Sequence, residues 1–171
     1  MANRTTGFTL VETLVVVAIL GLLAAISIPL TINSINRSKQ AQSMANIRAI
    51  AVAWEMRNAD VKAYNAAGAT YRLPTITVTA TNLATILSPT YIRAIPTRDG
   101  WNTPLDFLSD AQIGSRTAQA KTYAIRSRGR DKVLAGTGRT YTIGATTNFD
   151  CDIVYSQGAF QVYPEGKQNA K

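Results

Sequence analysis

The sequence contains no histidine and a single cysteine, Cys151, among its 171 residues. Without histidine the chain cannot form a Ser-His-Asp or Cys-His nucleophile arrangement, nor a histidine-ligated zinc or iron site. One cysteine cannot form a disulfide within the chain, so the fold is not a disulfide-stapled scaffold. The two aspartates that flank Cys151 are expected to raise the pKa of its thiol, which predicts a small buried hydrophobic residue rather than a nucleophile. These absences argue against an enzyme.

Acidic residues are also scarce, because 18 Lys and Arg stand against 10 Asp and Glu, for a net charge of +8. A basic balance of this kind raises the question of nucleic-acid binding. The arginines, however, are spread from Arg37 to Arg139 and form no basic stripe with interleaved aromatic residues. We therefore expect no nucleic-acid partner for the isolated subunit.

Charge is absent from one long stretch, the 24 residues from Thr13 to Asn36. Between residues 8 and 32, 18 of 25 residues are apolar. This meets the requirement of about 20 residues for a bilayer-spanning helix. The sequence thus predicts a membrane-spanning segment over residues 8–36 and a soluble, mixed-charge head over residues 37–171.

Glu12 is a carboxylate inside this apolar run. A buried and unpaired carboxylate costs several kcal/mol, so Glu12 either reaches headgroup water at the membrane boundary or pairs with a cation. The short basic stretch of residues 1–7 is followed immediately by the apolar run at Phe8. This order differs from that of a secretory signal peptide, in which a small-residue cleavage site follows the apolar region.

The start of the apolar run resembles the G-F-T-L-x-E processing motif of type IV pilins and type II secretion pseudopilins, in the residues Gly7-Phe8-Thr9-Leu10-Val11-Glu12. The resemblance implies that a prepilin peptidase removes residues 1–7 by cutting after Gly7 and methylates the new amino terminus on Phe8. It also implies that Glu12 of one subunit pairs with the Phe8 amine of a neighbour. A misregistered subunit would leave both charges unpaired, so the pair would specify the assembly register.

Gly21 and Pro29 interrupt the helix-forming character of the apolar segment. Proline costs roughly 3 kcal/mol and glycine about 1 kcal/mol relative to alanine inside a helix. A proline in a membrane helix can be a tolerated kink. In the family that the chain resembles, similar residues bracket a stretch that loses helicity when subunits pack, so we expect residues 21–29 to be such a soft segment.

The helical pattern continues into the head, where apolar residues recur on one face with Arg57 as the polar interruption: Ile47, Ile50, Trp54, Val61 and Tyr64. This spacing predicts one helix from residue 8 to about residue 67, ended by Gly68 in a left-handed C-cap. Trp54 is interpreted as a core residue.

A short helix over residues 83–87, capped by Asn82, is expected next. Strand-like runs separated by glycines follow: Leu105–Leu108, Thr122–Ser127, Thr140–Ile143, Ile153–Ser156 and Phe160–Tyr163. The expected fold is therefore α+β, with a long N-terminal helix that spans the membrane in its first half. Its second half packs on a small antiparallel sheet, as in pilins.

Two head segments extend the resemblance. The segment from Asp99 to Phe107 looks like the D-x-W-G-x-P-aromatic segment of major pseudopilins, with Asn102 where glycine is usual. Asparagine tolerates the same left-handed conformation. The stretch from Tyr123 to Gly138 resembles the Y-x-I-x-S-x-G-x-D-G-K…G-T segment of the same family.

Many major pseudopilins bind calcium in this C-terminal loop, so the resemblance implies Asp131, Asp150 and Asp152 as candidate ligands. Calcium takes six to eight oxygen ligands. Lys132 and Arg139, however, place cations where such a site needs glycine and acidic residues. The alternative is that Asp150 and Asp152 pair with nearby arginines on the surface.

The resemblance implies a structural subunit that polymerises, most like the major pseudopilin of a type II secretion system. The alternative is a type IV pilin of a surface fibre for adhesion, motility or DNA uptake. The segment from Asp99 to Pro104 and the lack of a C-terminal disulfide pair favour the first. A membrane-anchored enzyme lacks support for want of catalytic residues.

The implied partners are copies of the chain, a prepilin peptidase, an inner-membrane assembly platform and minor pilins or pseudopilins. The implied location is the bacterial inner membrane as a single-pass subunit, and a periplasmic or surface filament after assembly.

Overall fold

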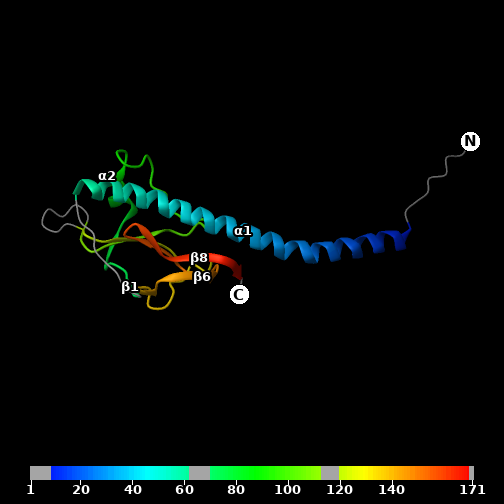
Figure 1. Cartoon of the computed structure of the whole chain (residues 1–171). Helices are drawn as coiled ribbons and strands as arrows, with labels where there is room; N and C mark the ends of the chain where they lie inside the picture. The colour runs from blue at the N-terminus through cyan, green and yellow to red at the C-terminus, as the bar shows by residue number, and fades with distance from the viewer. Residues whose placement is uncertain (1–8, 62–69, 113–119, 170–171) are drawn as a thin grey trace, which may run out of the picture. The chain divides into compact units, whose positions relative to one another are not determined.

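The computed structural model describes residues 9–61, 70–112 and 120–169. The chain divides into two compact units, Met1–Ile35 and Asn36–Lys171. Figure 1 shows the elements, which are α1 (Leu10–Val61), β1 (Thr70–Arg72), β2 (Ile76–Val78), α2 (Ala80–Leu87), β3 (Asp106–Ser109), β4 (Tyr123–Ser127), β5 (Thr140–Thr142), β6 (Gly144–Asn148), β7 (Ile153–Ser156) and β8 (Ala159–Asn169).

The described part of the first unit is the apolar half of α1. Its large apolar side chains are exposed, with Leu14 at 63% and Leu22 at 65% of their full accessibility. This stretch holds a window of mean hydropathy 2.7, so it is long and apolar enough to cross a membrane. Gly21 and Pro29 both lie within the continuous helix. Loss of helicity between them on packing stays a prediction.

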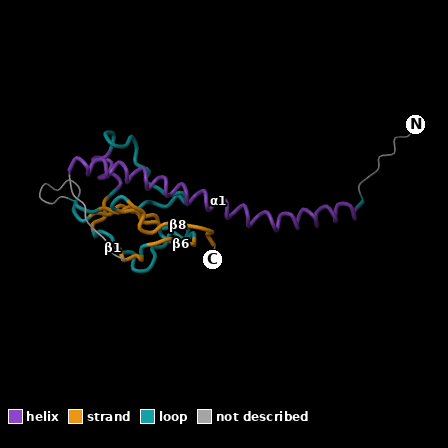
Figure 2. Tube along the Cα trace, viewed as in Figure 1, coloured by secondary structure: helices purple, strands orange, loops and turns teal. Residues whose placement is uncertain are grey.

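The second unit contains a six-stranded sheet in the order β2-β3-β4-β7-β8-β6 and a separate two-stranded sheet of β1 and β5 (Figure 2). Neighbouring strands are antiparallel except β6 and β8, which are parallel. The predicted α+β class is confirmed. The expected antiparallel sheet is also confirmed except at one edge, where β6 runs parallel to the second half of β8, a strand that extends to Asn169 rather than Tyr163.

The predicted helical stripe forms the centre of the main core. Ile47, Ile50 and Trp54 are each at most 2% exposed. The Trp54 and Tyr123 rings pack with centroids 4.4 Å apart. Burial of such aromatic and aliphatic side chains is what fixes the second half of α1 to the sheet. The expected C-cap at Gly68 lies outside the described residues.

A second, smaller core lies on the other face of the sheet. It consists of Leu73, Ala124, Tyr141, Val154 and Val162. All five residues of β4 are consequently buried, on both faces of the strand. A strand covered on both sides has no solvent face for a charged residue. The charge of Arg126 in β4 therefore needs a partner inside the protein.

The short helix α2 begins earlier than expected. Thr79 is its N-cap, and the Thr79 hydroxyl accepts a hydrogen bond from the Asn82 backbone N–H. The expected N-cap at Asn82 is therefore wrong. Thr79, three residues earlier, is the N-cap, and Asn82 lies in the first turn with its backbone N–H bonded to that cap. The helix then buries Leu83 and Leu87, one turn apart, in the main core.

Candidate functional site

The amino-terminal end of α1 is closed by three reciprocal hydrogen bonds between Thr9 and Glu12. The Thr9 backbone N–H and the Thr9 hydroxyl each donate to Glu12 Oε2, both at 2.8 Å. The Glu12 N–H donates to Thr9 Oγ1 at 3.3 Å. This is a capping box, which satisfies donors that the first helical turn leaves free. The carboxylate of Glu12 is thus held directly at the residue that follows Phe8.

Gly7 and Phe8, the predicted cleavage and methylation residues, lie outside the described residues. Their chemical roles stay predictions. What the structure adds is the position of Glu12, whose charge lies at the positive end of the helix dipole. The same exposed carboxylate remains accessible for the predicted pairing with the amine of a neighbouring subunit.

The segment from Asp99 to Thr103 docks on the second half of α1. The buried Asp99 carboxylate accepts hydrogen bonds from the backbone N–H groups of Trp101 at 3.0 Å and Thr103 at 2.8 Å. A Cβ atom on Gly100 would lie 2.0 Å from the Lys39 carbonyl oxygen, so only glycine permits this approach.

Asn102, which replaces the usual glycine of this motif, has a φ of +62°. The expectation that asparagine adopts the left-handed conformation here is confirmed. Lys132, at the second position where glycine is usual, also has a positive φ, of +63°. Both residues therefore adopt the left-handed conformation that glycine favours.

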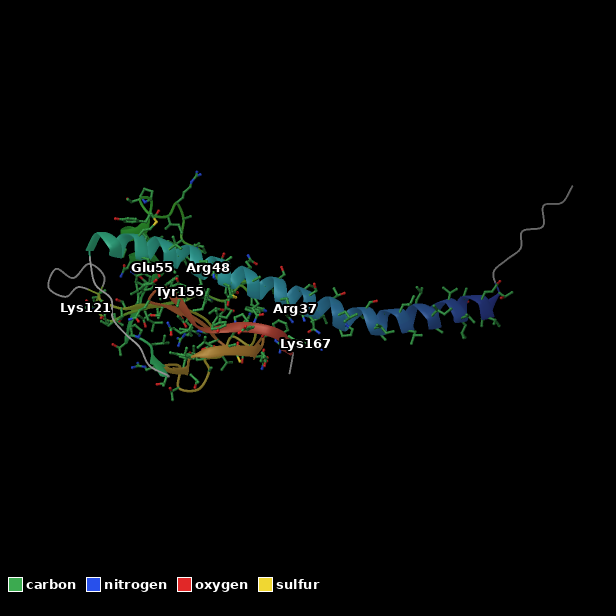
Figure 3. The ribbon with its side chains drawn as sticks, in the orientation of Figure 1. Arg37, Arg48, Glu55, Lys121, Tyr155 and Lys167 are labelled. Carbon is green, nitrogen blue, oxygen red and sulfur yellow. The ribbon has the colours of Figure 1, made fainter. Side chains whose placement is uncertain are left out.

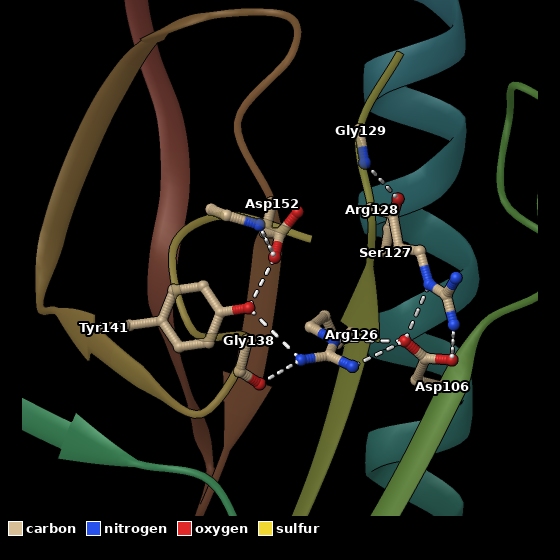
Figure 4. Close-up of polar contacts among 9 residues, drawn as sticks. Asp106, Arg126, Ser127, Arg128, Gly129, Gly138, Tyr141 and Asp152 are labelled. Atoms are coloured by element: carbon tan, nitrogen blue, oxygen red, sulfur yellow. Dashed lines mark hydrogen bonds and ion pairs between the residues drawn. The ribbon is translucent and has the colours of Figure 1, made fainter. Parts of the chain in front are cut away.

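A hydrogen-bonded network connects three strands and a loop on the second face of the sheet (Figure 4). At its centre is Arg126 of β4, only 5% exposed. Its guanidinium donates to Asp106 Oδ2 at 3.1 and 2.8 Å, to the Gly138 carbonyl, and to the Tyr141 hydroxyl at 3.2 Å. Arg128 donates to both oxygens of Asp106, at 3.0 and 2.8 Å. The buried arginine is therefore neutralised, as a buried charge requires.

The network continues from Tyr141 to Asp152. The Tyr141 hydroxyl donates to Asp152 Oδ2 at 2.5 Å, and the Ala135 N–H donates to the same oxygen at 3.2 Å. Burial, together with the Asp152 carboxylate, raises the pKa of Tyr141 to about 12. Burial also raises the pKa of Asp152. At Asp106 burial acts in the same direction, but the hydrogen bonds from Arg128 and Arg126 outweigh it and lower the pKa of that carboxyl.

The three predicted calcium ligands are not arranged as a calcium site. Both oxygens of Asp150 accept hydrogen bonds from Arg130, at 2.7 and 2.9 Å. Asp131 is exposed and accepts the N–H of Val133 within its own turn.

Asp152 Oδ1 is buried and has no hydrogen-bond partner, which is the one feature that would suit a cation. Across the described ranges, no group of three acidic, cysteine or histidine residues lies close enough to hold a metal ion. The carboxylates present therefore do not fit calcium, which needs six to eight oxygens. Asp150 instead forms the arginine pair named as the alternative, whereas Asp152 is bound through Tyr141.

Cys151 is half-buried at the turn before β7, less enclosed than expected. Burial, with the charges of Asp152 and Asp150, raises the pKa of its thiol. The direction matches the expectation from its neighbours and makes the thiol a poor nucleophile.

The structure therefore combines an exposed apolar amino-terminal helix, long enough to cross a membrane, with an α+β head, which is the architecture of a subunit with an amino-terminal membrane anchor. The family model of the prokaryotic N-terminal methylation motif matches residues 2–28. The type II secretion system core protein G of Aeromonas hydrophila is 30% identical over 116 residues, 66% of this chain and 78% of that protein. The chain therefore belongs to the family of type IV pilins and type II secretion pseudopilins.

Two further relatives support this assignment over shorter stretches. The core protein G of Pseudomonas aeruginosa is 40% identical over 62 residues, 36% of this chain and 44% of that protein. The type IV major pilin protein PilA of Myxococcus xanthus is 51% identical over 47 residues, 28% of this chain. The chain spans about a fifth of the length of that pilin, 21%. No solved structure matches the chain.

The sequence interpretation missed Asp106, Arg126 and Tyr141 as a connected group. A usable signal was present, because Arg126 stands inside the strand-like run Tyr123–Ser127 among residues that are otherwise apolar or small. A cation in such a run requires a partner carboxylate on an adjacent strand.

Proposed function

We propose that this chain is the major pseudopilin of a type II protein secretion system, a structural subunit without enzymatic activity that polymerises through its apolar helix. The observation that carries the proposal is the exposed apolar half of α1, whose side chains from Leu10 to Ile32 are covered by nothing in the described chain. A helix that is apolar all round is stable only in lipid or in the core of an assembly. Copies of the same helix are its natural neighbours in a filament.

The residues at the start of the helix are proposed to direct processing and register. A prepilin peptidase would cut after Gly7 and methylate Phe8, and the Glu12 carboxylate would then pair with the Phe8 amine of a neighbouring subunit. Two charges of opposite sign favour this pairing in a low-dielectric filament core. The single-pass inner-membrane subunit would pass through an assembly platform, with minor pseudopilins, into a periplasmic filament.

The second candidate is the major pilin of a surface fibre. The 51% identity to a type IV major pilin over 47 residues is the observation in its favour. The first candidate is preferred because the similarity to the Aeromonas core protein G extends over 66% of the chain and so includes part of the head.

Expression in a bacterium that lacks its own major pseudopilin tests the proposal. Restored export of the secretion substrate, with periplasmic filaments that contain this chain, is the expected result. Restored surface fibres and twitching in a pilin-deleted strain, without restored secretion, would support the second candidate instead. Failure of the chain to enter filaments in both strains would contradict both.

We also propose that the network of Asp106, Arg126, Tyr141 and Asp152 holds the C-terminal loops of the head without calcium. Arg126 links two strands to the Gly138 carbonyl, and Tyr141 links β5 to Asp152. A buried guanidinium and its carboxylate here cross-link the segments that surround the predicted metal ligands.

A further inference from the structure

A cavity of about 460 Å³ opens on the second unit between α1 and the end of β8. Its lining includes two cationic side chains, Arg37 and Lys167, and two buried amide side chains, Gln40 and Gln168. Figure 3 shows Arg37 on α1 and Lys167 on β8 at the same end of the head. Two cations from segments far apart in the sequence therefore converge on one recess.

No ion pair neutralises the two cations of this recess within the part of the chain that the structure describes. Neither Arg37 nor Lys167 forms an ion pair with any residue that the structure describes. Glu165 also lines the cavity, but it is exposed and is bridged to neither cation. The recess thus presents two hydrogen-bonding cations to an incoming anion.

The floor of the recess is fixed in position. Gln40 Nε2 donates to Gln168 Oε1 at 3.4 Å. Gln168 Nε2 donates to the carbonyl oxygens of Thr146 at 2.8 Å and Glu165 at 2.9 Å. These buried amides thus link α1 to β8 beneath the two cations.

Position along the chain indicates which anion would meet the recess. Arg37 follows directly after the charge-free stretch Thr13–Asn36, whose 24 helical residues are about 36 Å long. The hydrocarbon layer is about 30 Å thick, so a span of this length brings Arg37 to the level of the lipid phosphates. Met44 and Pro164 add apolar wall to the recess, which suits a glycerol backbone better than a free inorganic ion.

We propose that Arg37 and Lys167 form a binding site for the phosphate of an anionic phospholipid headgroup, occupied while the subunit resides in the membrane. The inference rests on membrane insertion of residues 13–36, which the proposed filament function also uses. Cations near an anionic surface attract it by about 1 kcal/mol each, or about fivefold in affinity. Release of this headgroup would accompany extraction of the subunit into a filament.

The test uses the full chain in micelles that contain equal amounts of phosphatidylglycerol and phosphatidylcholine with identical acyl chains. Native mass spectrometry then counts the retained lipids. We expect a preference for phosphatidylglycerol that falls about fivefold for each cation removed, in Arg37→Gln and in Lys167→Gln. The matched control, Lys121→Gln with Arg139→Gln, also removes two exposed positive charges and should keep the preference. Lys121 lies at the other end of the head in Figure 3.

Three results would overturn the proposal. Equal retention of the two lipids by the unaltered chain would exclude a headgroup site. Displacement of phosphatidylglycerol by millimolar inorganic phosphate would assign the recess to free anions. An unchanged lipid preference in the double variant Arg37→Gln with Lys167→Gln, accompanied by loss of filaments, would assign it to an acidic side chain of a neighbouring copy. Failure of the proposed filament function would appear separately, as absence of filaments from the unaltered chain.

Discussion

The Tyr141 hydroxyl lies 2.5 Å from Asp152 Oδ2 and donates a hydrogen bond to it inside the head. The tyrosine belongs to β5, in the two-stranded sheet, and the aspartate directly precedes β7 of the main sheet. One side-chain pair thus connects two sheets that share no backbone hydrogen bonds in the described ladders. Several consequences of this pair can be measured.

Removal of the hydroxyl in Tyr141→Phe should lower the free energy of unfolding by about 1–3 kcal/mol, because Asp152 loses its strongest donor while it stays buried. Denaturant unfolding of the full chain in micelles measures this. Tyr163→Phe is the control, since no hydrogen bond of its hydroxyl is found among the described residues. Equal stability of the two variants would contradict the importance of the pair.

The same pair predicts a dependence on alkaline pH. The pKa of Tyr141 is raised from 10.0 to about 12, so the fold favours the protonated phenol. Its contribution is complete below pH 10 and is lost as the pH rises through about 12. The stability difference between the unaltered chain and Tyr141→Phe should therefore shrink across this window. A difference that stays constant from pH 9 to 12 would argue against the raised pKa.

Calcium chelation should leave the head unchanged. Because Arg130 occupies both oxygens of Asp150, calcium would have to displace a guanidinium to use that residue. A calorimetric melt of the full chain should show the same midpoint with a chelator and with added calcium. A midpoint that rises with calcium concentration would demonstrate binding to the native state and overturn the arginine-based account.

Glu12 offers a test that separates capping from charge. Glu12→Ala removes both, and should be processed and inserted but assemble poorly. Glu12→Gln keeps a residue that can complete the capping box with Thr9 but removes the negative charge. If the charge sets register, both variants give a low filament yield. A normal yield from Glu12→Gln would show that capping alone suffices.

The leader assignment depends on Gly7. Gly7→Ala, and more strongly Gly7→Leu, should block removal of residues 1–7, because the proposed cleavage follows this residue directly. Intact-mass spectrometry of the membrane fraction distinguishes the uncut chain from one that begins with methylated Phe8. An amino terminus at Phe8 in both variants would refute the cleavage assignment.

The sequence alone was sufficient to predict α1 and its buried stripe, because Ile47, Ile50 and Trp54 repeat with the helical period over several turns. It also located β3, β4, β5, β7 and the start of β8, each as a short strand-like run. It did not reveal β1, β2 or β6. β6 is mostly polar, and β1 and β2 have only three residues each, too few to show an alternating pattern; each strand pairs with a segment that is not its neighbour in a hairpin. Such strands exist because of their partners rather than their own composition.

The network around Arg126 escaped prediction for a related reason. A charged residue in a strand normally faces solvent, and only the second core on the far face of the sheet buries this one. Pairing of Asp150 with an arginine was predicted as the alternative, because several arginines occur in this part of the sequence. Its partner Arg130 lies 20 residues earlier, so the pairing itself depends on the fold.

The docking of Gly100 on α1 has a mechanical consequence. The Gly100 N–H donates to Ser43 Oγ, and the Ser127 hydroxyl of β4 donates to the adjacent Asp99 carboxylate. A force along the second half of α1 therefore has a polar route to β4 through these hydrogen bonds, in addition to the closely packed apolar core. A load carried by the helix would thus be shared between these hydrogen bonds and the apolar packing before it reached the sheet.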